Sequence, residues 1–211
     1  MITKVLRNRP LAERSILNTV ILFLVCISLY ASQAIAAESP RSVVQTFTDE
    51  VFQILRQHPQ NTLTRRVQIQ AVVDRCFDTQ GMASLALGRA WRRLYPEQRQ
   101  EFTEEFTKLL YYQYIGDIEK FAGQRIMYYG RSISPNQAMV EASVGGGQVS
   151  VDYWLYLKDG NWKIYDVSVQ GMSVVLNYRD QFAPILTYGS FKDLSMMLRE
   201  QIARMCGSYR C

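Results

Sequence analysis

Residues that could carry catalysis are sparse in this chain of 211 residues. Its one histidine, His58, stands directly before Pro59. A Ser-His-Asp or Cys-His arrangement would have to use this residue, and no second histidine or carboxylate stands at the helical spacing of a metal site. The glycines at 145–147 are followed by neither a lysine nor a helical pattern, so they do not form a phosphate-binding loop. We therefore predict that the protein is not an enzyme and has no catalytic residue, metal or cofactor.

The elements that would position any site follow from the spacing of apolar residues. Residues 40–122 and 172–205 show helical periodicity, and residues 124–169 between them show alternation. Ser39 and Pro40 form a helix start, and His58-Pro59 ends that helix. The order of helices, strands and helices predicts an α+β fold.

Turn residues divide the alternating block into strands. Gly146-Gly147 and Asp159-Gly160 are two-residue hairpin signals, because both turns need positive φ angles. Pro135-Asn136 marks a third turn. The sequence therefore predicts a four-stranded antiparallel sheet with strands at about 124–134, 137–145, 148–158 and 161–169.

Hairpin turns also fix which residues face each other across the sheet. All three turns agree on one mainly apolar face, on which the predicted pairs are Met127 with Val144, Tyr129 with Ala142, Arg131 with Val140, Val151 with Ala142, Tyr153 with Val140, Leu155 with Ile164, Leu157 with Trp162 and Tyr153 with Asp166. This face is the strongest structural prediction from the sequence.

The second strand of this face carries small side chains, Ala138, Val140 and Ala142. Two interpretations remain open. Either a helix packs closely over these residues, or they leave a hollow that holds a ligand.

Arg131 and Asp166 are predicted to lie in one lateral row of the same face. A buried charge needs a partner, so the row lies at an exposed rim or its charges are paired. For Asp166 we favour a structural role over contact with a ligand. It would either accept a hydrogen bond from the Tyr153 hydroxyl or cap the end of a helix. Arg131 is a candidate for attracting a phosphate group at the mouth of a pocket.

The first 36 residues have the pattern of a secretory signal peptide. A basic leader precedes the apolar run 16–30, and Ala34-Ile35-Ala36 supplies a cleavage pattern of small residues. The run is shorter than the ~20 apolar residues of a membrane span, so we expect export and cleavage near Ala36. Basic residues after the leader occur only in pairs such as Arg65-Arg66, which gives no indication of nucleic-acid binding.

Three cysteines follow the expected cleavage site. Cys206 and Cys211 are close enough in sequence to close a small terminal loop by a disulfide. Cys76 lies in a helical apolar pattern and is expected to be a small buried residue. The role of residues 205–211 is not evident from the sequence.

Several short motifs, taken together and in this order, resemble the MlaC (toluene-tolerance auxiliary) family of periplasmic phospholipid-binding proteins. The resemblance extends from about Pro40 to Ala203, and the residues that carry it are Phe77-Asp78, Met82-Ala83, Leu87-Gly88, Trp91, Gln98, Phe102, Phe106, Leu109-Leu110, Tyr114, Trp162 to Val167, Gly171-Met172-Ser173 and Tyr178-Arg179.

The resemblance implies one lipid-binding domain over residues 37–211, with the mixed helical and NTF2-like architecture of that family enclosing an apolar pocket. It implies a periplasmic carrier that buries the acyl chains of phospholipid and maintains the lipid asymmetry of the outer membrane. The implied partners are an inner-membrane ABC transporter complex with MCE domains and an outer-membrane lipoprotein complex. A carrier of another amphiphile, such as a hopanoid, and an NTF2-like interaction module without ligand are the alternatives.

On this interpretation the pocket wall is formed by the apolar sheet face and by apolar helical residues. The candidates are Met127, Tyr129, Val140, Ala142, Val151, Tyr153, Leu155, Trp91, Phe106, Leu110 and Met172.

Overall fold

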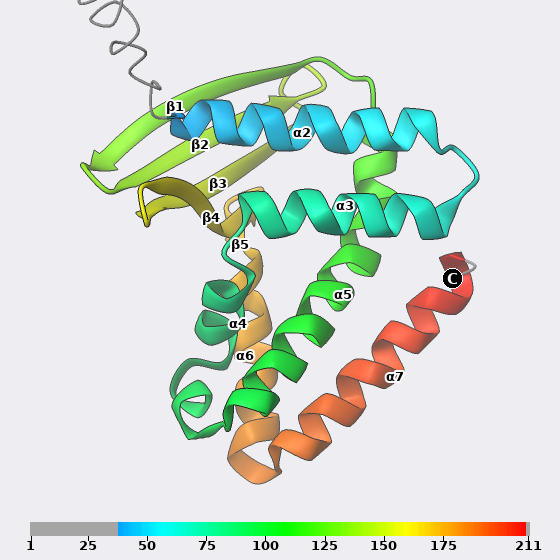
Figure 1. Ribbon diagram of the computed structural model, residues 1–211, viewed down its shortest axis with the longest axis vertical. Helices are drawn as coiled ribbons and strands as arrows, with labels where there is room; N and C mark the ends of the chain where they lie inside the picture. Colours follow the sequence, from blue (N-terminus) through cyan, green and yellow to red (C-terminus); the bar gives the residue numbers. More distant parts are fainter. Residues whose placement is uncertain (1–37, 210–211) are drawn as a thin grey trace, which may run out of the picture. The chain divides into compact units, whose positions relative to one another are not determined.

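The computed structural model describes residues 38–209, and the predicted signal peptide and Cys211 lie outside these residues (Figure 1). Five helical segments precede the sheet: α2 (Pro40–Gln57), α3 (Thr62–Cys76), α4 (Thr79–Leu87), the 3₁₀ helix η2 (Gly88–Arg93) and α5 (Pro96–Phe121). The strands are β1 (Ile126–Ser134), β2 (Gln137–Val144), β3 (Val149–Lys158), β4 (Asn161–Val169) and β5 (Met172–Ser173). Helices α6 (Val174–Tyr188) and α7 (Phe191–Tyr209) follow.

The predicted start and end of the first helix are confirmed. The Ser39 hydroxyl accepts a hydrogen bond from the backbone amide of Ser42 at 3.1 Å, and Pro40 occupies the first turn of α2. His58 caps the other end with a backbone bond to Ile54. The buried residues of α2, among them Val44 and Val51, lie on one face of the helix.

The sheet is antiparallel, with strand order β1-β2-β3-β4-β5. The prediction of an α+β fold is confirmed, with five strands in place of four. The additional strand, β5, has two residues, which is too short to produce an alternating pattern. At the β3–β4 turn Asp159 and Gly160 both have positive φ, 51° and 78°, as the predicted hairpin requires.

The register between β2 and β3 is as predicted, with Val140 opposite Tyr153 and Ala142 opposite Val151. The predicted register of β1 is wrong by one residue. Tyr128 lies opposite Ala142, and Gly130 lies opposite Val140. The cause is an irregularity between Ser132 and Ser134, which adds one residue to the strand and turns its side chains to the other face.

A second irregularity separates the two halves of β3 and β4. Leu155 pairs with Ile164 as predicted, but beyond this point Trp154 pairs with Asp166 and Tyr153 with Val167. Asp166 is therefore on the face opposite to Tyr153. Because both β1 and the end of β4 are displaced, Arg131 and Asp166 still share one lateral row, on the other face and with Met139 and Trp154 between them.

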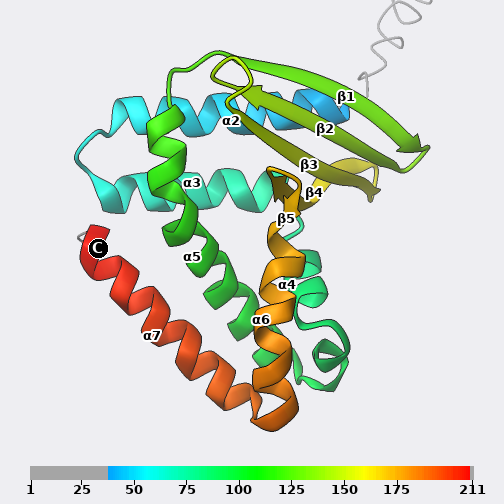
Figure 2. The same ribbon diagram turned by 180° about the vertical axis from the view of Figure 1, so that it is seen from behind.

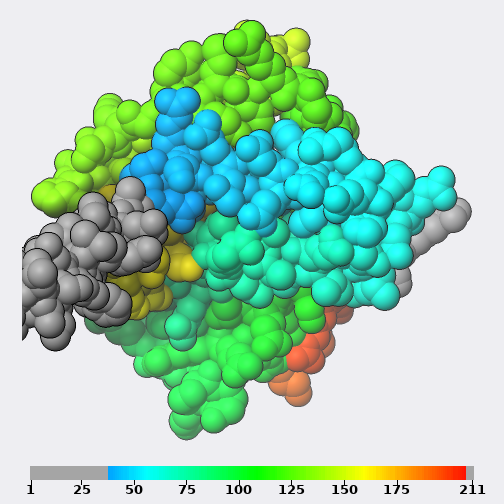
Figure 3. Space-filling model, turned by 45° about the horizontal axis from the view of Figure 1, so that its top comes forward, coloured from blue at the N-terminus to red at the C-terminus, as the bar shows by residue number. Residues whose placement is uncertain are grey.

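The helices build two separate cores. Helices α2 and α3 lie side by side over one face of the sheet, which we call the inner face (Figures 1 and 3). The first core lies in this layer and includes Val44, Val140 and Leu155. Helices α4, α5, α6 and α7 enclose the second core, which includes Phe102, Phe106 and Phe182 (Figure 2).

Asp166 fixes the start of α6 to the sheet. Its carboxylate accepts hydrogen bonds from the Ser173 hydroxyl at 2.5 Å and from the Val175 amide at 3.2 Å. It also accepts from the Val167 amide at 2.8 Å. Of the two structural roles predicted for Asp166, the one at a helix end is confirmed. The hydrogen bond from Tyr153 is not formed, because Tyr153 lies on the opposite face.

Asp78 fixes the start of α4 to the same sheet. Its carboxylate accepts from the Gly81 amide at 3.1 Å, from the Lys158 ammonium at 3.1 Å and from the Tyr156 hydroxyl. Burial acts to raise the pKa of this carboxyl, but the hydrogen bonds and the Lys158 charge outweigh burial, so its pKa is lowered. Asp78 is therefore held as a carboxylate that joins α4 to β3.

Replacing Asp166 by alanine is expected to lower the free energy of unfolding by about 2 kcal/mol, because it removes a helix cap and leaves a buried amide without an acceptor. Denaturant unfolding of the Asp166→Ala protein measures this loss. Asp180→Ala is the matched control, since Asp180 is exposed on α6, and a change within about 0.5 kcal/mol is expected there. Equal effects of the two substitutions would contradict the role of Asp166.

Candidate functional site

The inner face of the sheet is filled by protein side chains. Val140, Leu155 and Ile164 are 0% exposed in the first core. Tyr128, Tyr153 and other partly buried residues pack against the same core. Contact between these apolar side chains stabilises the fold, because it removes them from water and packs their atoms closely.

Helix α2 passes closely over the small side chains of β2. Ala138 and Ala142 are 4% and 2% exposed. At Gly130 an added Cβ would lie 3.9 Å from the Cβ of Arg41 at the start of α2. The structure therefore agrees with the first interpretation of this strand, in which a helix packs closely over it. The hollow of the second interpretation is not present at these residues.

Polar groups are buried inside this apolar layer. Burial raises the pKa of the Tyr153 hydroxyl and of the Tyr128 hydroxyl, and in both cases a hydrogen bond with Thr48 of α2 offsets part of the rise. Thr48 is 6% exposed, and its hydroxyl also donates to the Val44 carbonyl at 2.8 Å. Thr48 thus links α2 to β1 and β3 by hydrogen bonds within a largely apolar layer.

Five of the predicted wall residues do lie together on the inner face: Val140, Ala142, Val151, Tyr153 and Leu155. Met127 and Tyr129 are 40% and 54% exposed, because the shifted register turns them to the opposite face. Met172 is 63% exposed at the short strand β5. The predicted positions of these three side chains are wrong.

The helical candidates belong to the second core. Phe106 is 1% exposed there, and Trp91 and Leu110 pack against the same cluster. The helical period shows that a face is buried, but it does not say which element covers it. The predicted single wall is therefore divided between two cores.

Arg131 is exposed on the outer face of the sheet, not at the mouth of an inner pocket. There its charge lowers the pKa of Asp152, although burial and the Glu141 carboxylate raise that pKa by more. The position predicted for Arg131 is wrong for the same reason as those of Met127 and Tyr129.

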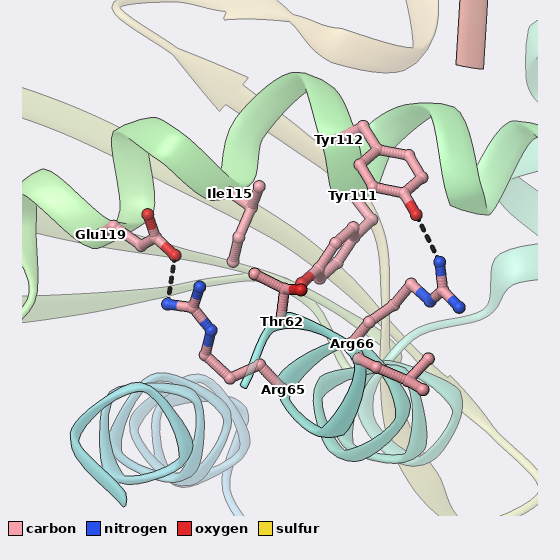
Figure 4. Close-up of a pocket in the computed structure, with 8 residues that line it drawn as sticks. Thr62, Arg65, Arg66, Tyr111, Tyr112, Ile115 and Glu119 are labelled. Atoms are coloured by element: carbon pink, nitrogen blue, oxygen red, sulfur yellow. Dashed lines mark hydrogen bonds and ion pairs between the residues drawn. The ribbon is translucent and has the colours of Figure 1, made fainter. Parts of the chain in front are cut away.

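A small pocket between α3 and α5 was not predicted. Its volume is about 20 Å³, and it is lined by Thr62, Leu63, Arg65, Arg66, Tyr111, Tyr112, Ile115 and Glu119 (Figure 4). Arg65 makes an ion pair with Glu119 at 2.5 Å, and Arg66 donates a hydrogen bond to the Tyr112 hydroxyl. The adjacent arginines at the start of a helical pattern were the only signal in the sequence for this pocket.

A larger groove of about 430 Å³ lies between α5 and α7. Two of its lining residues, Ser195 and Arg199, are paired with carboxylates of α5. Glu105, which is 8% exposed, accepts hydrogen bonds from Ser195 and Arg199, and Arg199 also pairs with Glu101.

Within residues 38–209, no group of three or more histidine, cysteine, aspartate or glutamate residues is placed to hold a metal ion. None of the helices described is both long and apolar enough to cross a membrane. Cys76 is a free, buried thiol, as expected. Cys206 is in a disulfide, and its predicted partner Cys211 lies outside the described residues.

The match to the family described as MlaC protein covers residues 45–200, from the first turns of α2 into α7. The chain belongs to the MlaC family. The toluene tolerance protein ttg2D of Pseudomonas putida is 28% identical in an alignment of 177 positions, which covers 76% of this chain and 79% of that protein. A phospholipid-binding protein of Ralstonia solanacearum, solved in complex with a phospholipid, superimposes with a TM-score of 0.72 at 25% identity and covers 79% of this chain and 98% of that chain.

The part of this MlaC chain that matches the family includes the whole sheet and most of both cores. Asp78 and Asp166, which fix the starts of α4 and α6 to the sheet, also lie inside this part. The family resemblance predicted from the sequence is therefore confirmed over three quarters of the chain.

The corrected register of this MlaC protein predicts unequal effects of two truncations. Leu155→Ala is expected to lower the free energy of unfolding by about 3 kcal/mol, because it leaves a cavity in the first core. Met127→Ala removes an exposed side chain and is expected to change it by less than about 1 kcal/mol. Chemical denaturation measures both values, and a large loss for Met127→Ala would restore the register predicted from the sequence.

Proposed function

We propose that this protein binds phospholipid and carries it, without enzymatic chemistry, by burying the acyl chains next to the inner face of the sheet. The observation that carries this proposal is the phospholipid bound to the Ralstonia protein, nearly all of which superimposes on this chain. Membership of the MlaC family supports the same conclusion.

The carrier would act in the periplasm, after removal of the leader near Ala36, and would move phospholipid between the outer and inner membranes to maintain outer-membrane lipid asymmetry. Its partners would be an inner-membrane ABC transporter complex with MCE domains and an outer-membrane lipoprotein complex. The family match and the pattern of the leader support this role.

Carriage of a two-tailed lipid requires extensive burial. Some thirty methylene groups leave the bilayer, and at roughly 0.8 kcal/mol each their exposure to water would cost on the order of 20 kcal/mol. A shallow surface groove does not offset this cost, so the chains must enter the interior. The inner face offers the apolar surface, but α2 and α3 already cover it.

Entry of the chains therefore requires α2 to move away from the inner face of the sheet, while the end of α3 stays joined to β4 by the hydrogen bond from the Asp78 amide to the Ile164 carbonyl. Asp78 and Asp166 fix α4 and α6 to β3 and β4, whereas α2 contacts the sheet largely through apolar side chains. We infer that the layer between α2 and the sheet opens while the contacts of β3 and β4 with α4 and α6 persist.

One observation favours a different kind of protein. The filled inner face is also what an NTF2-like interaction module without ligand would have. A carrier of another amphiphile, such as a hopanoid, would need the same opening as a phospholipid carrier. Mass spectrometry of an organic extract of the purified protein separates the three functions, with phospholipid, another lipid or no lipid as the respective results.

We expect phospholipid in that extract, and a lower melting temperature after the lipid is removed. A ligand that binds only the folded protein stabilises it, by about 2.7 kcal/mol at a concentration of one hundred times the dissociation constant. Differential scanning calorimetry before and after delipidation, with re-addition of phospholipid as control, measures the effect. Identical melting temperatures for the two forms would count against bound acyl chains.

A disulfide between α2 and β1 tests the route of entry. The 3.9 Å between the Cβ of Arg41 and an added Cβ at Gly130 falls in the range of ~3.5–4.5 Å found in disulfides. The oxidised Arg41→Cys/Gly130→Cys protein is expected to take up no phospholipid from vesicles, and reduction is expected to restore uptake. The single Arg41→Cys variant is the control, and uptake by the oxidised double variant at the wild-type rate would exclude this route.

A further inference from the structure

We propose that the pocket between α3 and α5 binds the phosphate group of a phospholipid through Arg65 and Arg66. This inference rests on the proposed function and adds to it the place of the head group. The pocket takes the place of Arg131 as the candidate phosphate site, because Arg131 lies on the outer face of the sheet.

Arg65 has an unused donor directed into the protein. Its side chain is 12% exposed, and its Nη1 is paired with Glu119. Its Nε is buried and has no hydrogen-bond partner. A buried donor without an acceptor is costly, and most such groups in native proteins have a partner. A phosphate oxygen would supply the missing acceptor.

Arg66 adds a second guanidinium to the same pocket (Figure 4). Its Nη1 donates to the Tyr112 hydroxyl, and among the described residues no carboxylate forms an ion pair with it. The charges of Arg65, Arg66 and Glu119 leave the pocket with a net positive charge. Planar guanidinium groups match the geometry of phosphate oxygens and bind them through paired hydrogen bonds.

The floor of the pocket joins it to the proposed acyl-chain layer. Ile115 is 3% exposed and belongs to the first core, together with Val140 and Leu155. Tyr111 packs against the same core. Leu63, which also lines the pocket, is 55% exposed. A lipid with its chains beside the first core would thus have its phosphate at a cationic, partly open edge of that core.

The volume of about 20 Å³ sets how the phosphate would lie. It is close to the space of one water molecule, so one phosphate oxygen would enter and the remaining oxygens would stay at the open side. The head group beyond the phosphate would then be in solvent.

In the test, the full-length protein is incubated with vesicles that contain equal amounts of phosphatidylglycerol and of diacylglycerol with the same acyl chains. Mass spectrometry of the recovered protein gives the ratio of the two lipids. The wild type is expected to prefer phosphatidylglycerol, and the Arg65→Gln/Arg66→Gln protein is expected to lose about tenfold or more of this preference, as expected for lost charge-assisted hydrogen bonds. Arg131→Gln removes a positive charge from the outer face and is expected to keep the wild-type ratio.

A second variant guards against a loss of folding. Glu119→Gln removes the carboxylate that competes for Arg65, and it is expected to raise the preference for phosphatidylglycerol severalfold. A misfolded protein would not give this gain. Melting temperatures of all variants are recorded alongside.

The outcomes separate this inference from the proposed function. Uptake of neither lipid by the wild type would overturn carriage itself. Uptake with an unchanged ratio in the double arginine variant would overturn the phosphate site and leave carriage standing. Saturation of the arginines by inorganic phosphate alone, with no preference between the two lipids, would identify a site for free phosphate and overturn the lipid assignment.

Discussion

The cover that α2 and α3 form over the inner face of the sheet is the contact on which the other features depend. Without these helices, Val140, Leu155 and Ile164 would face water, and the first core would not exist. Because the contact of α2 with the sheet is largely apolar, it has little directional preference and tolerates displacement better than a network of buried hydrogen bonds. A lipid that enters this layer would exchange protein–protein contacts for protein–lipid contacts of the same kind.

The remaining helices are held differently. Asp78 and Asp166 connect the starts of α4 and α6 to the sheet through several hydrogen bonds each. The second core below them is rich in aromatic contacts, such as Phe106 with Tyr178 at 5.4 Å between ring centroids. The protein thus combines a helical part that hydrogen bonds hold to the sheet with a largely apolar inner cover. The small pocket with Arg65 and Arg66 lies where α3 and α5 meet.

Much of the fold could be predicted from the sequence, because caps, turns and periodicity are local properties. Ser39 and His58 bounded α2 correctly, and Asp159-Gly160 placed the β3–β4 turn. The errors arose where one extra residue changes the face of a strand: near Ser132 in β1, and between β3 and β4 beyond Leu155. Alternation alone does not reveal such a residue. Nor does local periodicity say that Phe106 on α5 and Val140 on β2 belong to different cores, since that depends on contacts distant in the sequence.

The free thiol of Cys76 has a consequence for how the chain matures. Burial raises its pKa, so the reactive thiolate is scarce in the folded protein. In an oxidising compartment the thiol is open to wrong pairing with Cys206 only while α3 is not yet docked. Early closure of the α2–α3 pair on the sheet would therefore act as protection against misoxidation during folding, in addition to its role in the mature protein.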